Sequence, residues 1–261
     1  MVTDAVWLDL TDDKRLDLIV VGEWMPITVL IQNASGVFQD KTSGYNLKNS
    51  NGWWNTIASN DFDKDGDIDL IVGNLGLNSR LRANLKEPVS IFIGDIDKNG
   101  SLDPILTYYN QHIRYPFVSR DQLVKQVPSL KRKFLKYENY KNVRVEDILT
   151  NEDLNTFIQK SAYVFSSVYL QNDGNGKFSL IDLPTEAQLS PIFSFLVDDI
   201  NKDGHSDILA TGNFFATQPD FGRAAPLWGT SPPPQVGHCA RESTRPAHAL
   251  AALRVSASRS S

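Results

Sequence analysis

The chain has 261 residues, of which 41% are hydrophobic, and a formal net charge of −5. This length and composition are sufficient for a folded protein with a substantial core, which excludes a chain that is disordered throughout. Residues 1–223 carry 22 basic and 30 acidic side chains. They would repel a phosphate backbone, so we expect no nucleic-acid partner.

No apolar run approaches the roughly 18 residues that a membrane-spanning helix requires. The first ten residues have neither the basic nor the apolar region of a signal peptide. We therefore expect no transmembrane segment. A single cysteine, Cys239, excludes an internal disulfide framework and leaves the cellular compartment open.

The aspartates are distributed very unevenly along the chain. Aspartate occurs 24 times and glutamate 7 times, and 16 of the aspartates fall at residues 9–17, 61–69, 95–103 and 198–207. A solvated acidic surface would use glutamate as freely, whereas the short aspartate side chain suits tight loops and metal coordination. The bias therefore indicates a local cause in these four stretches.

In chain order, each aspartate-rich stretch contains a nonapeptide followed by an apolar segment of strand length. The nonapeptides are DLTDDKRLD from Asp9, DFDKDGDID from Asp61, DIDKNGSLD from Asp95 and DINKDGHSD from Asp199. The following segments are residues 18–22, 70–73, 104–109 and 208–212. Residues 29–40 and 168–180 place Asn and Gly turn residues between apolar pairs, which predicts hairpins. We therefore expect a mainly β fold.

A helical insertion is predicted over residues 111–162. The third and fourth nonapeptides start 104 residues apart, and the sequence between them has helical composition. Thr150 is a predicted N-cap, with Asp153 three residues later. This insertion contains a basic run that could bind an acidic partner, although a solvated helix face explains it more simply. The run consists of Lys131, Arg132, Lys133 and Lys136.

Composition changes abruptly near residue 223. Residues 224–261 include 8 Ala, 6 Ser and 5 Pro, carry a net charge of +3 and show no strand or helix periodicity. We expect residues 1–223 to form a β repeat region and residues 224–261 to be a disordered or non-native tail. The alternative for this tail is a basic arm that binds nucleic acid.

Three of the nonapeptides have oxygen-bearing side chains at positions 1, 3, 5 and 9, and glycine at position 6. Several carboxylates in one tight loop repel one another, and a bound cation resolves this repulsion. All-oxygen ligation is typical of calcium, and position 7 can offer a backbone carbonyl. The predicted Ca²⁺-binding residues are Asp61, Asp63, Asp65, Asp67, Asp69, Asp95, Asp97, Asn99, Ser101, Asp103, Asp199, Asn201, Asp203, His205 and Asp207.

Glycine at position 6 suggests that each loop reverses through a positive φ, which costs a residue with a side chain ~1 kcal/mol or more. These loops are not EF-hands. An EF-hand loop ends on a bidentate Glu at position 12, where this chain has Val72, Leu106 and Ala210, and its flanking elements are helices rather than strands.

The first nonapeptide departs from the pattern. It has Thr11 at position 3, and Lys14 and Arg15 at the positions of glycine and a neutral residue, so positive charge competes at the site. Metal binding and its absence are equally consistent with this loop. Its candidate ligands, which would form a weaker site, are Asp9, Thr11, Asp13 and Asp17.

The loops and their trailing strands resemble the VCBS/FG-GAP repeat family of bacterial, Bacteroidetes-type repeat proteins. The resemblance covers residues 1–223 and extends to the hairpin at 168–180 and to the segments GEWMPI (22–27), GWWN (52–55) and GNLGLNS (73–79). It implies a β-propeller of four-stranded blades, similar to that of integrin α-subunits, with calcium in the aspartate loops. About four loops imply a partial propeller. Members are typically exported, which implies an extracellular, periplasmic or cell-surface location.

Two functions from different classes fit these observations. We expect a calcium-binding scaffold, without catalytic residues, that binds a protein or glycan in an adhesive role. The alternative is a polysaccharide-active enzyme on a calcium-stabilised propeller. Sixteen of the chain's 31 acidic residues lie in the four aspartate-rich stretches, where metal coordination would occupy them. His112 and His205 are the only histidines before the tail, and no familiar catalytic motif occurs. Trp53 and Trp54 could stack on sugars, but core packing is the simpler interpretation.

Overall fold

The computed structural model describes residues 1–212 and 250–253, and the strands dominate it, as predicted. The first sheet contains, in order, β1 (Val2–Leu8), β2 (Asp17–Met25), β3 (Thr28–Gln32) and β4 (Phe38–Asp40), with β5 (Gly52–Trp53) paired to the end of β2. The second sheet is formed by β6 (Thr56–Asn60), β7 (Asp69–Gly73), β12 (Val168–Asn172) and β13 (Phe178–Asp182), in the order β13-β12-β7-β6.

The other two sheets are also antiparallel. The third has the order β10-β9-β8-β11 and consists of β8 (Val89–Gly94), β9 (Asp103–Asn110), β10 (Ile113–Pro116) and β11 (Ile158–Ala162). The fourth has the order β14-β15-β16 and consists of β14 (Ser194–Asp198), β15 (Asp207–Thr211) and β16 (Leu250–Leu253).

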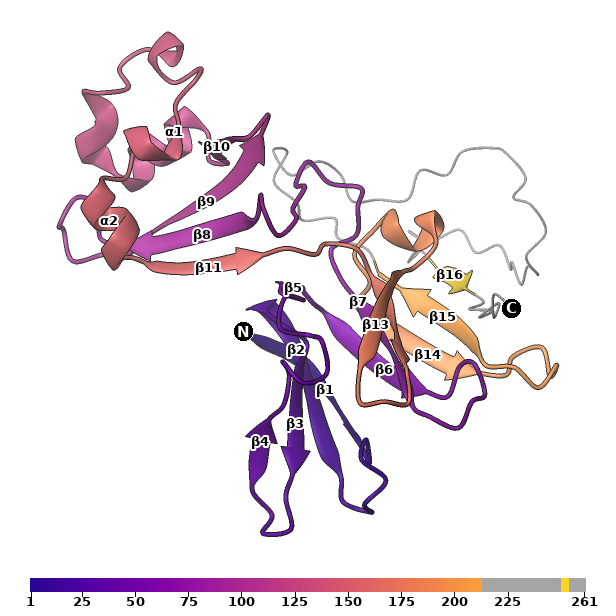
Figure 1. The fold of residues 1–261 in the computed structure, drawn as a ribbon. Helices are drawn as coiled ribbons and strands as arrows, with labels where there is room; N and C mark the ends of the chain where they lie inside the picture. The colour runs from indigo at the N-terminus through magenta and orange to yellow at the C-terminus, as the bar shows by residue number, and fades with distance from the viewer. Residues whose placement is uncertain (213–249, 254–261) are drawn as a thin grey trace, which may run out of the picture.

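The first, second and fourth sheets pack face to face through two apolar cores. Strand β7 reads DLIVG and is buried along its whole length, because its alternate side chains enter different cores. Leu70 and Val72 join the core shared with Ile19 of the first sheet. Ile71 joins the core shared with Ile208 of the fourth sheet. The second sheet therefore lies between the other two, as a blade of a propeller lies between its neighbours (Figure 1).

The third sheet is inserted into the second. The chain leaves the second sheet after β7 and returns to it at β12, so residues 74–167 lie between two neighbouring strands of that sheet. Val72 of β7 pairs directly with Val168 of β12. The third sheet and its helices therefore form a lobe, residues 89–162, that stands apart from the other three sheets in Figure 1. An aromatic cluster connects this lobe to the first sheet, where the Trp53 ring packs edge-on against Trp24 and Phe165.

The helical region is narrower than the predicted insertion at 111–162. It comprises α1 (Arg120–Gln126), α2 (Asn151–Thr156) and three 3₁₀ helices, η1 (Pro128–Lys131), η2 (Tyr137–Asn139) and η3 (Val145–Asp147). The two ends of the predicted insertion are strands β10 and β11. Strand β10 forms a hairpin with β9 through Gln111 and His112, which both have positive φ, and this turn lacks the usual Asn or Gly signal.

Local sequence explains how these helices begin. Ser119 caps α1 and forms a capping box with Gln122. Thr150 caps α2 with Asp153 at the third position, which confirms the predicted N-cap. Apolar side chains of the helical region pack with Phe92 and Ile105 of the third sheet into a separate core. A further 3₁₀ helix, η4 (Thr185–Gln188), precedes β14.

The predicted boundary at residue 223 and most of the predicted tail, 224–261, lie outside the described residues. Residues 250–253 are described as strand β16, which pairs with β15, and the sequence did not predict this strand. Within the described residues, no helix has the length and hydropathy needed to span a membrane.

Candidate metal centres

All four aspartate nonapeptides occupy the same place in their sheets. They connect β1 to β2, β6 to β7, β8 to β9, and β14 to β15. In each sheet these are the first two strands in sequence order. The repeat read from the sequence is therefore a structural repeat, with one loop at the equivalent hairpin of each sheet.

A shared set of side-chain to backbone hydrogen bonds folds each loop. The aspartate at position 1 accepts a hydrogen bond from the backbone N–H at position 6, over 2.6, 3.1, 2.8 and 2.8 Å in chain order. The aspartate at position 9 accepts one from the N–H at position 2, over 3.1, 3.2, 3.2 and 3.1 Å. These bonds replace the backbone pairing that a tight turn lacks, which explains why the short aspartate recurs here.

Backbone conformation also repeats from loop to loop. Gly66, Gly100 and Gly204 have φ values of 98°, 89° and 82°, which confirms the predicted positive φ at position 6. Position 4 is left-handed as well, with φ between 54° and 62° in all four loops. The sequence did not reveal this second left-handed position, because the second, third and fourth loops have Lys there, which carries no such signal.

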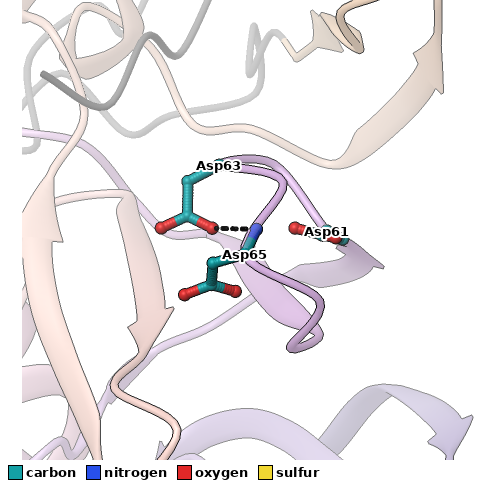
Figure 2. Close-up of side chains that lie close together, drawn as sticks. All are labelled: Asp61, Asp63 and Asp65. Atoms are coloured by element: carbon teal, nitrogen blue, oxygen red, sulfur yellow. Dashed lines mark hydrogen bonds between the residues drawn. The ribbon is translucent and has the colours of Figure 1, made fainter.

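In the second loop, Asp61, Asp63 and Asp65 come together. One carboxylate oxygen from each lies within 4.8 Å of the others, and Figure 2 shows the three side chains around one curve of the loop. Asp63 accepts hydrogen bonds from the backbone of Asp65 (3.3 Å) and from Nε2 of Gln171 (2.8 Å). The Oδ1 atom of Asp61 is buried and has no hydrogen-bond partner.

The other two predicted ligands of the second loop lie elsewhere. Asp69 is fully buried, and its two oxygens accept hydrogen bonds from the Tyr169 hydroxyl (2.7 Å) and the backbone N–H of Asn172 (2.8 Å). Burial raises the pKa of Asp69 above its usual value. The Asp67 side chain points to Gly174, where a Cβ would lie 2.7 Å from its Oδ2. Asp69 therefore anchors the loop, and neither Asp67 nor Asp69 belongs to the carboxylate cluster of Asp61, Asp63 and Asp65.

The third loop gathers a different combination of carboxylates. Asp95, Asp97 and Asp103 each place an oxygen within 4.8 Å of the others, and Asp103 is buried. Burial raises the pKa of Asp103. The Oδ1 atom of Asp97 is buried without a hydrogen-bond partner, as Oδ1 of Asp61 is in the second loop. Asn99 accepts a hydrogen bond from the backbone N–H of Ser101 (2.7 Å).

Part of the chain matches a known protein family. The family model of the FG-GAP-like repeat matches residues 9–72, from the start of the first loop to the end of β7. Residues 9–72 are an FG-GAP-like repeat. A comparison with curated protein sequences gave no match. FG-GAP repeats form propeller blades, which agrees with the face-to-face packing of the first, second and fourth sheets.

In the first loop of this FG-GAP-like repeat, a positively charged side chain pairs with one of the aspartates. The Arg15 guanidinium forms a salt bridge with Asp13 and also donates a hydrogen bond to the Gln32 carbonyl (3.2 Å). Lys14 adopts the left-handed conformation, φ 66°, that glycine has in the other loops. Asp17 is buried and accepts hydrogen bonds from the backbone of Leu10 and Gln32. The structure does not bring Asp9, Thr11, Asp13 and Asp17 into a carboxylate cluster within the described residues.

The fourth loop repeats the hydrogen bonds of the other three loops, with an amide among its carboxylates. Asn201 donates a hydrogen bond from Nδ2 to Asp203 (3.1 Å), and Asp203 accepts one from the backbone N–H of His205 (2.9 Å). Asp199 and Asp207 accept the two bonds that are common to all the loops. The Lys64 ammonium of the second loop donates to the Gly204 carbonyl, so the second and fourth loops touch.

The second and third loops fit a divalent cation by their chemistry. Each offers three carboxylates at close range, and each has one buried oxygen that no protein donor satisfies. A buried, unpaired charge is costly, and the all-oxygen donor set matches the preference of calcium. The FG-GAP-like repeat at 9–72 contains the first of these two clusters.

Proposed function

We propose that this chain is a calcium-binding β-propeller scaffold that binds a protein or glycan outside the cell. The observation that carries the calcium part is the pair of buried, unpartnered carboxylate oxygens, Oδ1 of Asp61 and Oδ1 of Asp97. All four loops form many internal hydrogen bonds, yet these two oxygens have no donor, and Asp61 and Asp97 each belong to a carboxylate cluster. A cation at each cluster would satisfy them.

In the second loop, Asp61, Asp63 and Asp65 would hold the ion, and in the third loop Asp95, Asp97 and Asp103 would do so. The fourth loop has the same backbone geometry and would form a site with Asp199, Asn201 and Asp203. Calcium would supply positive charge that removes the repulsion among these carboxylates. The chain's own contribution is to position the oxygens through the bonds to backbone N–H groups.

Binding rather than catalysis is the role that these loops support. Carboxylates that hold an ion and accept backbone hydrogen bonds are unavailable as a general acid or base. His205 is in the fourth loop, where its backbone N–H is bonded to Asp203. Trp54 is fully buried in the first core and donates from Nε1 to the Ser50 carbonyl (2.9 Å), so it offers no sugar platform.

A location outside the cell agrees with how such loops bind calcium. Extracellular calcium modules function with dissociation constants of about 10⁻⁴–10⁻³ M, because calcium is abundant there. The three carboxylates of each cluster form a short loop without the bidentate Glu that tightens an EF-hand, and weak affinity of this kind is what we expect.

The test is a calorimetric titration of the full chain with calcium, and with magnesium as the comparison. We expect saturable calcium binding below about 1 mM, a higher melting temperature in calcium than in chelator, and weaker binding of the smaller magnesium ion. A chain that binds no calcium at millimolar concentration, and melts identically in chelator, would refute the calcium part of the proposal.

A further inference from the structure

The helical part of the inserted lobe concentrates positive charge on a negatively charged protein. Residues 120–144, here called the cap, include eight basic and two acidic side chains, a net charge of +6. The other 236 residues carry 18 basic and 29 acidic side chains, a net charge of −11. The net charge of the cap is therefore opposite in sign to the net charge of the rest of the chain.

Most of the basic side chains of the cap point into solvent. Arg120 and Lys133 are exceptions, because Arg120 pairs with Asp121 and Lys133 donates to the Asp147 carbonyl. Five others are exposed and have no ion-pair or side-chain hydrogen-bond partner within residues 1–212 and 250–253. They are Lys125, Lys131, Arg132, Lys136 and Lys141.

A solvated surface usually mixes charges of both signs. Lys131, Arg132 and Lys136 instead lie on one short stretch without an acidic neighbour between them. A polyanionic ligand would neutralise the positive charge of this stretch.

The cap is a firm support for such a ligand. Leu123, Val127 and Phe134 are almost completely buried in the core that the cap shares with the third sheet. Leu135 is 64% exposed. One exposed leucine does not form the apolar helix face that insertion into a lipid bilayer requires. The buried core also fixes the backbone that carries the basic residues, so little backbone conformational entropy is lost when they bind.

The polar neighbours of these cations favour a sugar polymer over a nucleic acid. Asn139 and Asn142 are exposed beside Lys136 and Lys141, and amides bond to hydroxyl groups as cations pair with carboxylates. Single-stranded nucleic acids also stack their bases on free aromatic faces. Arg120 occupies one face of the Tyr137 ring, with its guanidinium carbon 4.9 Å from the ring centroid. We propose that the cap is a docking surface for a carboxylated polysaccharide.

This inference rests on the proposed binding function and specifies the ligand class and the surface. The test uses the full chain with calcium present and fluorescein-labelled hyaluronate, a linear carboxylated polysaccharide, in an anisotropy titration. Neutral dextran, duplex DNA, polyglutamate and phosphatidylglycerol vesicles serve as the competing probes. We expect hyaluronate to bind, dextran not to bind, and the affinity to fall as salt is raised, because exposed charges are screened.

The decisive variant is the triple reversal Lys131→Glu, Arg132→Glu and Lys136→Glu, which should weaken hyaluronate binding at least roughly tenfold. The matched control places the same charge change on exposed lysines of the first two sheets, as Lys41→Glu, Lys48→Glu and Lys177→Glu, and should retain the wild-type affinity. Replacement of the three cap residues by Gln should weaken binding by a smaller factor. Melting curves and the calcium titration verify that each variant is folded.

Equal loss of hyaluronate binding in the cap and control variants would overturn the proposal, because the effect would then reflect net charge alone. It would also be overturned if hyaluronate did not bind, or if DNA, polyglutamate or the vesicles bound more tightly. Calcium binding that persisted in such an experiment would leave the proposed scaffold function standing, so failure of the two proposals can be distinguished.

Discussion

Replacing Asp61 by Asn should change stability in opposite directions with and without calcium. The amide has the same shape, and its oxygen can still accept the hydrogen bond from the Gly66 N–H, which is 3.1 Å long in the wild type. The substitution removes one of three charges that lie within 4.8 Å of one another. At that distance two unit charges repel by about 3 kcal/mol at an effective dielectric of 20, an upper bound that water and salt reduce.

In chelator, Asp61→Asn should therefore be at least as stable as the wild type. In calcium the order should reverse. A calcium concentration ~100 times the dissociation constant stabilises the folded protein by ~2.7 kcal/mol per site, and the variant loses this contribution. For a protein of this size that corresponds to a melting temperature lower by about 5–10 °C. Thermal melts at about 10 mM calcium, and again in chelator, measure both quantities.

The matched control is Asp13→Asn in the first loop, where Arg15 already supplies the positive charge. This variant should melt with the same calcium dependence as the wild type. The reasoning is refuted if Asp61→Asn loses as much stability in chelator as in calcium, since Asp61 would then stabilise the loop without an ion. It is also refuted if both variants respond to calcium equally.

Three further substitutions test individual contacts. Tyr169→Phe removes the hydroxyl that donates a hydrogen bond to the buried Asp69, and should lower the free energy of unfolding by about 1–3 kcal/mol. Urea titrations measure this loss, and a loss below about 0.5 kcal/mol would contradict a stabilising role for the bond. Arg15→Gln frees Asp13, and the calcium stoichiometry measured by calorimetry should rise by one, whereas an unchanged stoichiometry would show that Arg15 does not exclude the ion. Gly100→Ala meets no neighbouring atom but has φ 89°, so it should cost about 1 kcal/mol from backbone strain alone, and a neutral result in urea would contradict that assignment.

Much of the local structure could be predicted from sequence because it is encoded locally. The spacing of Asp and Gly within nine residues determines the loop, and the aliphatic residues that follow determine the strand. The lobe could not be predicted in the same way. Pairing of Val72 with Val168 is a contact between distant residues, and nothing near either residue in the sequence indicates the other. Strand β11 was read as helix because its Gln and Lys residues are exposed and carry no apolar alternation.

The candidate sites show the same division. Position in the nonapeptide correctly identified Asp61, Asp63 and Asp65 as neighbours in space. Position in the nonapeptide did not indicate that the Asp69 carboxylate accepts hydrogen bonds from the Tyr169 hydroxyl and the Asn172 backbone N–H. Those two partners come from a strand about one hundred residues away, so the competing role of Asp69 follows only from the assembled sheet.

The inserted position of the lobe imposes an order on folding. During synthesis β6 and β7 emerge well before β12 and β13, because residues 74–167 separate the two halves of the second sheet. Until β12 arrives, one edge of β7 has no partner, although its side chains are among the most apolar of the chain. Unpaired apolar edges promote aggregation. The rate at which the lobe folds and returns the chain to β7 therefore decides how long the nascent protein is exposed to that hazard.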